Sequence, residues 1–141
     1  MANELLLDTG ALVSILDRRQ REHTACVAVF ESWGGEILST EAVLSEAMHL
    51  LARVPGGQAR CLDFFLAEAA LSIPASLASL ARCRELITKY SDLPMDFADA
   101  SLVVLAEDLG TDLVFTTDRR DFGIYRAAGN RPFRIVPDLH V

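Results

Sequence analysis

The sequence predicts a three-layer α/β/α fold with a parallel central sheet, formed as a single domain over residues 1–141. Three observations support this prediction. Short apolar runs have the composition of fully buried strands. Stretches with apolar residues at helical spacing alternate with these runs, as they do in parallel sheets covered by helices. Glycine and proline clusters separate the elements, and no repeat or linker divides the chain.

The first part of the chain predicts two strands and two helices. Residues 5–7 are three leucines and form the first buried strand, which a helix over residues 9–17 follows. The basic run 18–21 ends this helix, and residues 22–33 form a second helix that two glycines close. Residues 37–38 make a minimal second strand.

The middle of the chain is mainly helical. Residues 41–53 predict a helix that ends before a Pro-Gly-Gly break. Residues 58–68 form the next helix, and residues 70–73 a short strand. Pro74 suits the entrance of a further helix over residues 75–90.

The last part of the chain contains the helix with the clearest signals. It begins at Met95 or Asp96 and runs to residue 109, with Gly110 in the position that usually follows a helix end. Residues 113–115 predict a strand, residues 119–122 a turn or short helix, and residues 133–136 a final strand.

Composition limits the class of protein without settling its partner. Half of the residues are hydrophobic, and no apolar run reaches the ~18–20 residues of a membrane span. No basic segment precedes the first apolar run, so we expect no signal peptide. The formal net charge of −7 argues against a basic nucleic-acid-binding face. Two divalent ions bound to clustered acids would cancel more than half of this charge and weaken the objection.

The cysteines indicate a reducing compartment. Cys26, Cys61 and Cys83 are odd in number and form no CxxC pair. We therefore expect reduced, structural thiols in a cytoplasmic protein.

Four acidic residues stand where apolar neighbours indicate burial. Asp8 and Asp118 follow predicted strands, whereas Glu46 and Asp99 have apolar residues at helical spacing, including Leu50 for Glu46. A buried carboxylate is costly unless it is paired, hydrogen-bonded or bound to a cation. No Lys or Arg occupies a matching position. Oxygen ligands from several acids predict one hard divalent cation, Mg²⁺ or Mn²⁺.

The predicted fold allows these acids to meet. In open parallel sheets, ligands bind at the carboxyl ends of the strands, where the strand order reverses. Asp8 and Asp118 each lie just past such an end. Asp96 and Asp99 are three residues apart, so they share a helix face in the first turn, where the helix dipole favours negative charge.

Each acid also has a purely structural explanation. Asp8 and Asp96 are good helix N-caps. Asp118 suits a turn, and Glu46 is long enough to reach solvent from the edge of an apolar stripe. Asp99 is the hardest to explain this way, because the residues on its helix face are apolar.

Four segments together resemble a known family. Residues 6–12 (LLDTGAL), 40–46 (TEAVLSE), 95–102 (MDFADASL) and 116–122 (TTDRRDF) resemble, in order and spacing, the four motifs of PIN-domain proteins. The resemblance covers nearly the whole chain. Its size and lack of added domains are most similar to the VapC-type toxins of bacterial toxin–antitoxin pairs.

The resemblance implies an Mg²⁺- or Mn²⁺-dependent ribonuclease with one or two metal ions. It assigns catalysis and metal binding to Asp8, Glu46, Asp99 and Asp118. It gives supporting roles to Asp96, Thr116 and Asp121. Gly10 departs from the serine that is common there, so the resemblance implies that one hydroxyl near the metal is missing.

Metal-assisted hydrolysis of a phosphodiester needs no Ser, Cys or His nucleophile. The three histidines form no metal-binding pair, and His49, three residues after Glu46, is better explained as an ordinary histidine. Candidates for guiding RNA phosphates are Arg119, Arg120, Arg126 and Lys89, although each also suits a solvated surface.

Other functions remain open at this point. A phosphatase with an Asp nucleophile would carry a second Asp two residues after the first, where this chain has Gly10. A receiver-like or scaffolding domain would not place Glu46 within a helix. A housekeeping PIN nuclease without an antitoxin and an inactive PIN-like binding domain are further alternatives.

The resemblance also implies protein partners, a cognate antitoxin and a second copy of the chain. An independent reason for a homodimer is the Ala- and Leu-rich segment 62–86, whose apolar residues exceed what one helix face needs. Packing into the core accounts for part of this excess.

Overall fold

The computed structural model describes residues 3–138, which contain a five-stranded parallel sheet with the strand order β3-β2-β1-β4-β5. The strands are β1 (Glu4–Leu7), β2 (Glu36–Thr40), β3 (Leu71–Ile73), β4 (Leu113–Phe115) and β5 (Arg134–Val136). The chain starts in the middle of the sheet, extends to β3 and then returns to the other side of β1 for β4 and β5. The predicted three-layer fold with a parallel sheet is thus confirmed.

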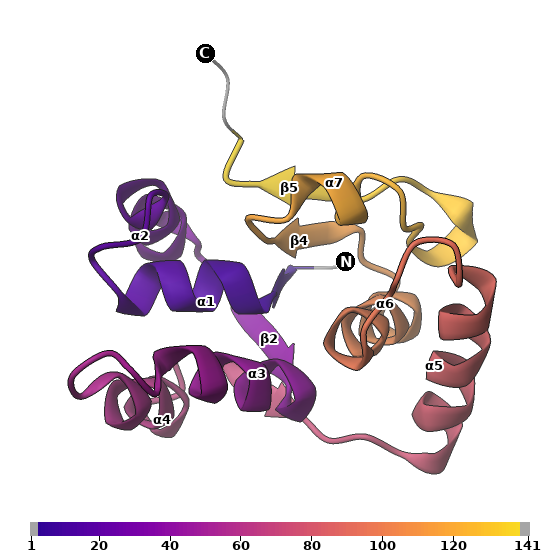
Figure 1. Cartoon of the computed structure of the whole chain (residues 1–141). Helices are drawn as coiled ribbons and strands as arrows, with labels where there is room; N and C mark the ends of the chain where they lie inside the picture. The colour runs from indigo at the N-terminus through magenta and orange to yellow at the C-terminus, as the bar shows by residue number, and fades with distance from the viewer. Residues whose placement is uncertain (1–2, 139–141) are drawn as a thin grey trace.

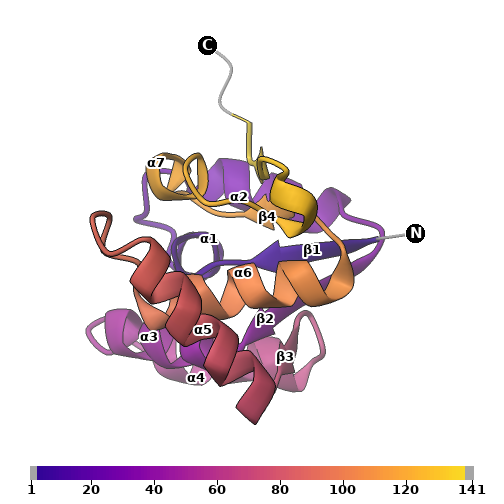
Figure 2. The ribbon, with the colours of Figure 1, turned by 90° about the vertical axis from the view of Figure 1, so that its right-hand side faces the viewer.

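Helices cover both faces of the sheet (Figure 1). They are α1 (Thr9–Leu16), α2 (His23–Ser32), α3 (Glu41–Leu51), α4 (Gly57–Leu66), α5 (Leu77–Lys89), α6 (Phe97–Leu109) and α7 (Arg119–Phe122), with a short 3₁₀ turn η1 (Ala128–Asn130) before β5. Helices α1 to α4 lie on one side of the strands. Figure 2 shows α5 and α6 in front of the sheet on the other side. None of the helices in residues 3–138 is long and apolar enough to cross a membrane.

The centre of the sheet is the centre of the core. Leu5, Leu6 and Leu7 of β1 have no exposed surface, and Val114 and Phe115 of β4 are also fully buried. A strand buried on both faces has no polar side, which explains why β1 is a run of identical apolar residues. At an order of ~2 kcal/mol for each fully buried large side chain, this pairing of β1 with β4 makes a substantial contribution to folding.

Helix ends follow local signals, with one correction. Gly110 follows α6 in the left-handed conformation, with φ of 70°, as predicted. The helix expected over residues 75–90 begins later, at Leu77. Ser76 and Ser79 form a capping box, in which each side chain accepts a hydrogen bond from the other's backbone N–H. This box, rather than Pro74, sets the start of α5.

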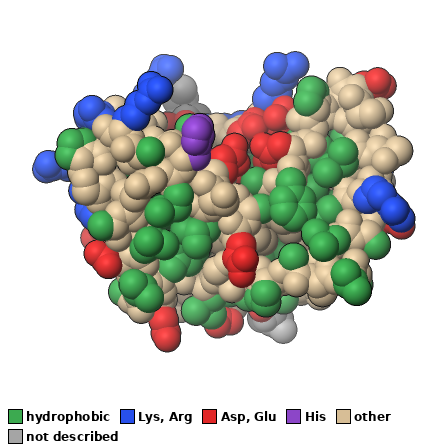
Figure 3. Space-filling model, turned by 60° about the horizontal axis from the view of Figure 1, so that its bottom comes forward, with side chains coloured by type: hydrophobic (Ala, Val, Ile, Leu, Met, Phe, Trp, Pro, Cys, Tyr) green, Lys and Arg blue, Asp and Glu red, His purple; other side chains and the backbone are tan. Residues whose placement is uncertain are grey.

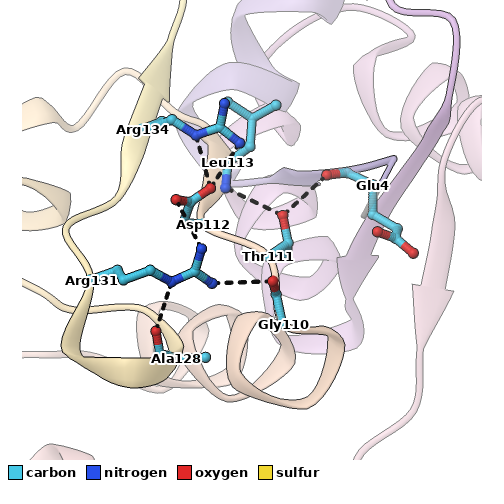
Figure 4. Close-up of polar contacts among 8 residues, drawn as sticks. All are labelled: Glu4, Gly110, Thr111, Asp112, Leu113, Ala128, Arg131 and Arg134. Atoms are coloured by element: carbon cyan, nitrogen blue, oxygen red, sulfur yellow. Dashed lines mark hydrogen bonds and ion pairs between the residues drawn. The ribbon is translucent and has the colours of Figure 1, made fainter. Parts of the chain in front are cut away.

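The amino end of the sheet is held by a separate polar cluster (Figure 4). Asp112 precedes β4 and accepts hydrogen bonds from Arg134 Nε at 2.9 Å and Arg131 Nη1 at 3.4 Å. The Arg134 backbone N–H also donates to the Asp112 carbonyl at 2.7 Å. Thr111 Oγ1 reaches the Glu4 carbonyl at 3.5 Å. These contacts join β5, β4 and β1 at their amino ends. The predicted acidic site lies at the opposite, carboxyl ends of the strands.

Candidate metal-binding active site

The carboxyl ends of β1 and β4 bring two of the predicted acids to one place. The strands pair in parallel with Leu7 opposite Phe115, and the Asp8 N–H donates to the Phe115 carbonyl at 2.9 Å. Strand order reverses between these two strands, because the chain moves from β1 to β2 on one side and returns to β4 on the other. This is the crevice in which open α/β sheets bind ligands.

Thr116 links the two acids directly. Its Oγ1 donates a 2.6 Å hydrogen bond to Asp8 Oδ2 and accepts one of 2.9 Å from the Asp118 N–H. Both Thr116 and Asp8 are buried. Asp8 stands at the N-cap position of α1 but makes no side-chain capping bond. Its carboxylate is therefore directed to the site rather than to the helix end.

The first turn of α6 supplies a third acid. Asp96 is the N-cap, as one reading of the sequence predicted, and its Oδ1 accepts a hydrogen bond from the Asp99 N–H at 2.8 Å. Asp96 is exposed, whereas Asp99 is buried with 9% of its surface accessible. The fully buried Tyr125 donates a hydrogen bond of 2.9 Å from its hydroxyl to Asp99 Oδ2.

Three carboxylates lie close enough to share an ion. Asp99, Asp118 and Asp121 each offer one oxygen, and these oxygens lie within 4.8 Å of one another. Asp118 caps the short helix α7, with its Oδ1 accepting from the Asp121 N–H at 3.0 Å. Asp121 was predicted to support the site. Its position in this group makes it a candidate ligand as well.

Glu46 approaches the site from α3 on the side of Asp8. It is half-buried, and its Oε2 accepts a 3.1 Å hydrogen bond from Thr9 Oγ1. Because Thr9 follows Asp8, this contact places Glu46 beside Asp8, and neither Glu46 nor Asp8 belongs to the group of three. The apolar surroundings expected for Glu46 are only partly present, since Leu50 is 52% exposed. Glu46 lies on the border between the core and an open groove of about 680 Å³ that Asp96 and His49 also line.

Burial and mutual repulsion raise the pKa values of these acids. Burial raises the pKa of Asp8 to about 6, with smaller contributions from the charges of Asp118 and Asp96. Burial also raises the pKa of Asp99 to about 8, helped by the negative charges of Asp8 and Asp96. The pKa of Asp121 is raised as well, first by burial and then by Asp118.

Positive charge from the protein does not balance this cluster. Within residues 3–138, no Lys or Arg forms an ion pair with Asp8, Glu46, Asp99, Asp118 or Asp121. The donors are carboxylate oxygens, which hard divalent cations prefer. A cation there would relieve both the repulsion and the cost of burial. The residues present therefore fit Mg²⁺ or Mn²⁺.

The three arginines predicted to guide RNA phosphates differ in the ion pairs and hydrogen bonds that their side chains form within the protein. Arg119 forms an ion pair with Glu22 at 2.7 Å and donates to the Pro137 carbonyl at 2.9 Å, so it ties α7 to α2 and to the segment after β5. Arg126 Nη1 donates to the carbonyls of residues 123–125. Arg120 is exposed, and its charge partly offsets the rise in the pKa of Asp121. Of the three, only Arg120 forms no ion pair or side-chain hydrogen bond among residues 3–138, so it is the one whose guanidinium is free to bind a phosphate.

Gly10 is required by a close neighbour. A Cβ at this position would collide with Oγ1 of Thr117. The space in which a serine side chain would stand at residue 10 is therefore occupied by the Thr117 hydroxyl. This arrangement places a hydroxyl near the site despite the glycine.

Sequence reasoning did not single out Thr9, Thr117 or Tyr125. Thr9 had a local signal, since it is a hydroxyl residue next to Asp8. Thr117 and Tyr125 became relevant only through contacts with residues 107 and 26 positions away in the chain, at Gly10 and Asp99.

The fold and the site define a class, an α/β domain with a cluster of carboxylates at the carboxyl ends of its central parallel strands. A family model described as the PIN domain matches residues 5–130, and the chain therefore belongs to the PIN-domain family. Among curated proteins, the chain is similar to Ribonuclease VapC26 of Mycobacterium tuberculosis, with 29% identity over 135 residues that cover 94% of this chain and 100% of that protein.

Solved structures share the fold. VapC20 of Mycobacterium tuberculosis, described as a Sarcin-Ricin loop cleaving toxin, aligns with a TM-score of 0.76 at 15% identity, covering 82% of this chain and 91% of that chain. VapBC2 of Rickettsia felis, solved bound to a DNA fragment from its promoter, aligns with a TM-score of 0.65 at 17% identity, covering 94% of this chain and 98% of that chain.

Proposed function

We propose that this chain is an Mg²⁺- or Mn²⁺-dependent endoribonuclease that hydrolyses RNA phosphodiester bonds, and that it is the toxin of a type II toxin–antitoxin pair. One observation supports the proposed ribonuclease activity. Asp8, Asp99 and Asp118 converge at the carboxyl end of the sheet without a positive partner in the described part of the chain, in a PIN-domain chain similar to a protein named as a ribonuclease.

The proposal assigns catalysis and metal binding to Asp8, Glu46, Asp99 and Asp118, with Asp121 as a further ligand candidate. When bound, a divalent cation supplies charge that stabilises the phosphate in the transition state and lowers the pKa of an attacking water. The acids themselves position the water and hold the cation, and no Ser, Cys or His nucleophile is required.

Three hydroxyl groups fix the directions of the carboxylates. Thr116 donates to Asp8, Tyr125 to Asp99, and Thr9 to Glu46. In each pair one carboxylate oxygen is held by the protein, which leaves the other for a ligand. Neighbours that orient metal-binding side chains in this way commonly affect metal affinity by ~10–100-fold.

Substitution of Asp99 by Asn tests the nuclease. It removes an anionic ligand and conserves shape, so we expect Mg²⁺-dependent cleavage of RNA to be lost while the folded state is retained. Asp108→Asn is the matched control, since it makes the same chemical change at an exposed position near the other end of α6. Cleavage at the wild-type rate by the Asp99→Asn protein would refute the shared-metal mechanism.

The toxin role rests on the similarity to VapC proteins and on exposed apolar surface that a partner would cover. Leu62 and Leu66 of α4 and Leu77 and Leu80 of α5 are 42%, 79%, 87% and 44% exposed. Figure 3 shows several such apolar patches on one face. An antitoxin that also blocked the acidic site would offer Arg or Lys to its carboxylates.

The gene immediately upstream provides the test of this second part. We expect its product to co-purify with this chain and to suppress RNA cleavage. If it does neither, the chain is a nuclease that acts without an antitoxin. Three buried cysteines and an RNA substrate favour a cytoplasmic location within this proposal.

A further inference from the structure

One end of this acidic protein is strongly basic. Residues 16–21 and 52–60 contain five arginines and a single acid, Asp17, in a chain of formal net charge −7. The five residues, here called the arginine end, are Arg18, Arg19, Arg21, Arg53 and Arg60. Arg18, Arg19 and Arg21 lie on the connection from α1 to α2, Arg53 lies on the connection from α3 to α4, and Arg60 lies in α4 itself. Figure 1 shows the two connections on the same side of the molecule. Arg60 joins the connections, donating to the Leu16 carbonyl at 3.2 Å and the Pro55 carbonyl at 3.0 Å.

Most of this positive charge is available to a ligand. The Asp17 carboxylate accepts hydrogen bonds from Arg19 Nε at 3.2 Å and from Gln20 Nε2 at 3.1 Å. Arg18, Arg21 and Arg53 are exposed, and among residues 3–138 they form no ion pair. Elsewhere on the protein, Arg82, Arg119, Arg131 and Arg134 are paired with acids, whereas Arg84, Arg120 and Arg126 form no ion pair among the described residues.

Helix α3 connects the acidic site to the arginine end. Glu46, His49 and Arg53 follow one another at spacings of three and four, so they lie along one side of the helix and its continuation. His49 lines the groove that Glu46 and Asp96 share. Arg53 lines the next hollow together with Val54 and Pro55, and these two residues also line the hollow of Arg18, Arg19 and Arg60.

The surface view agrees with this order. Along the upper edge of the face in Figure 3, positively charged side chains are followed by a histidine and then by a group of acidic side chains. Along this path from the arginine end to the candidate metal site, two of the three hollows share lining residues, and the charge changes from positive to negative.

We propose that the arginine end binds backbone phosphates of the RNA substrate on one side of the cleaved bond. This inference rests on the proposed ribonuclease function. An acidic site repels the rest of a polyanionic substrate, so positive charge must be supplied beyond it. Helix α1, eight residues long, spans about 12 Å between Asp8 and the connection that carries Arg18. At the ~3.4 Å rise of a stacked strand, the contacts fall about four nucleotides from the cleaved bond.

Binding measured without cleavage tests this assignment. The background is the Asp99→Asn protein with Mg²⁺, and the probe is a fluorescently labelled RNA of about twelve nucleotides, roughly three times the expected span. We expect Arg53→Ala and Arg18→Ala each to weaken binding about threefold to tenfold at low salt. Each should also reduce the slope of log affinity against log salt by about 0.7, the value for one lost phosphate contact on a single strand.

Arg84→Ala is the matched control, because Arg84 is an exposed arginine without an ion pair among the described residues. It belongs to α5, which Figure 1 shows on the opposite side of the molecule. We expect it to change affinity less than twofold. A labelled trinucleotide, too short to span the path, should bind the Arg53→Ala and parent proteins equally. Equal effects of Arg53→Ala and Arg84→Ala on the long RNA would overturn the inference and leave the proposed nuclease intact. No RNA binding by the Asp99→Asn protein without a second substitution would overturn both this inference and the proposed nuclease function.

Discussion

The hydroxyl of Tyr125 donates a 2.9 Å hydrogen bond to Oδ2 of Asp99, joining the segment after α7 to the first turn of α6. The ring of Tyr125 is fully buried and meets the rings of Tyr90 and Phe122 edge-on, at centroid distances of 5.1 Å and 5.2 Å. Because rings pack against Tyr125 on two sides, the position of its hydroxyl group is fixed. The packing of the core therefore sets the direction of the Asp99 carboxylate.

Replacing Tyr125 with Phe should weaken metal binding while the fold is kept. The ring still fills its place, but the carboxylate loses its fixed donor. We expect the Kd for Mn²⁺, measured by calorimetry or electron paramagnetic resonance, to rise about tenfold. Tyr90→Phe removes a hydroxyl from the neighbouring ring and serves as control. Equal Mn²⁺ affinities for the two variants would show that the Tyr125 hydroxyl does not orient Asp99.

The metal-free protein should lose stability as the pH rises from 5 to 8.5. The folded-state pKa values of Asp8 and Asp99, about 6 and about 8, lie above the ordinary value of 3.8. The native state therefore favours the protonated carboxyls. This stabilisation is complete below pH ~4 and is lost as the pH rises through the two folded pKa values. Urea unfolding in EDTA measures this loss, which for Asp8 alone is on the order of 1.4 kcal/mol between pH 5 and 8.5.

Asp8→Asn provides the control for this pH dependence. Asparagine cannot ionise, so the variant should show a smaller loss of stability over the same range and should be the more stable protein at pH 8. A parallel pH dependence in the variant and the parent would contradict the raised pKa of Asp8.

Divalent metal should raise the melting temperature. A ligand that binds only the folded state stabilises it by about 2.7 kcal/mol at a hundredfold excess over Kd. Melts in Mn²⁺ and in EDTA give the shift, which should shrink below pH 8 because metal must displace protons from Asp99. The Asp99→Asn protein should respond weakly. The absence of any shift at millimolar Mn²⁺ would favour an inactive PIN-like domain.

Gly10 and Thr117 should be energetically coupled. Gly10→Ala places a Cβ against Thr117 Oγ1 and should destabilise the protein by about 1–3 kcal/mol. Thr117→Ala removes that oxygen and should restore most of the loss in the double variant. Chemical denaturation of the four proteins gives the coupling free energy. Additive effects would mean that the two side chains do not compete for the same space.

The purified chain should form a homodimer. The apolar residues exposed on α4 and α5 would lose water contact on association. Light scattering at tens of micromolar measures the mass, and a monomer of 15.4 kDa would contradict the prediction. Leu77→Ser, at the residue with 87% exposure, should weaken the dimer without disturbing the core.

The sequence was most informative where local chemistry decides structure. The leucines of β1 and the Gly110 stop of α6 predicted their elements because burial and a positive φ leave few alternatives. Asp96 combined a capping role with a position beside the site, and both were foreseeable. The start of α5 was misplaced because the Ser76–Ser79 capping box competes with the weaker signal of Pro74.

Contacts between distant segments were beyond sequence reasoning. The Tyr125–Asp99 bond depends on how a loop packs against α6, and no periodicity indicates it. The pairing of Arg119 with Glu22 depends likewise on where α7 meets α2. In the sequence, the residues of the arginine end appear only as charged breaks between helices. That they lie close together follows from the contact between two distant segments of the chain, which the sequence does not show.

The position of β1 in the middle of the sheet has a consequence for the protein's synthesis. β1 is synthesised before its partner β4, which begins more than a hundred residues later, at Leu113. At ~5–20 residues per second, the nascent chain carries Asp8 for several seconds before Asp99 and Asp118 exist. The acidic site is therefore completed only after Asp118 has been added to the chain. A nuclease built in this order cannot attack RNA near its own ribosome until synthesis has passed that residue.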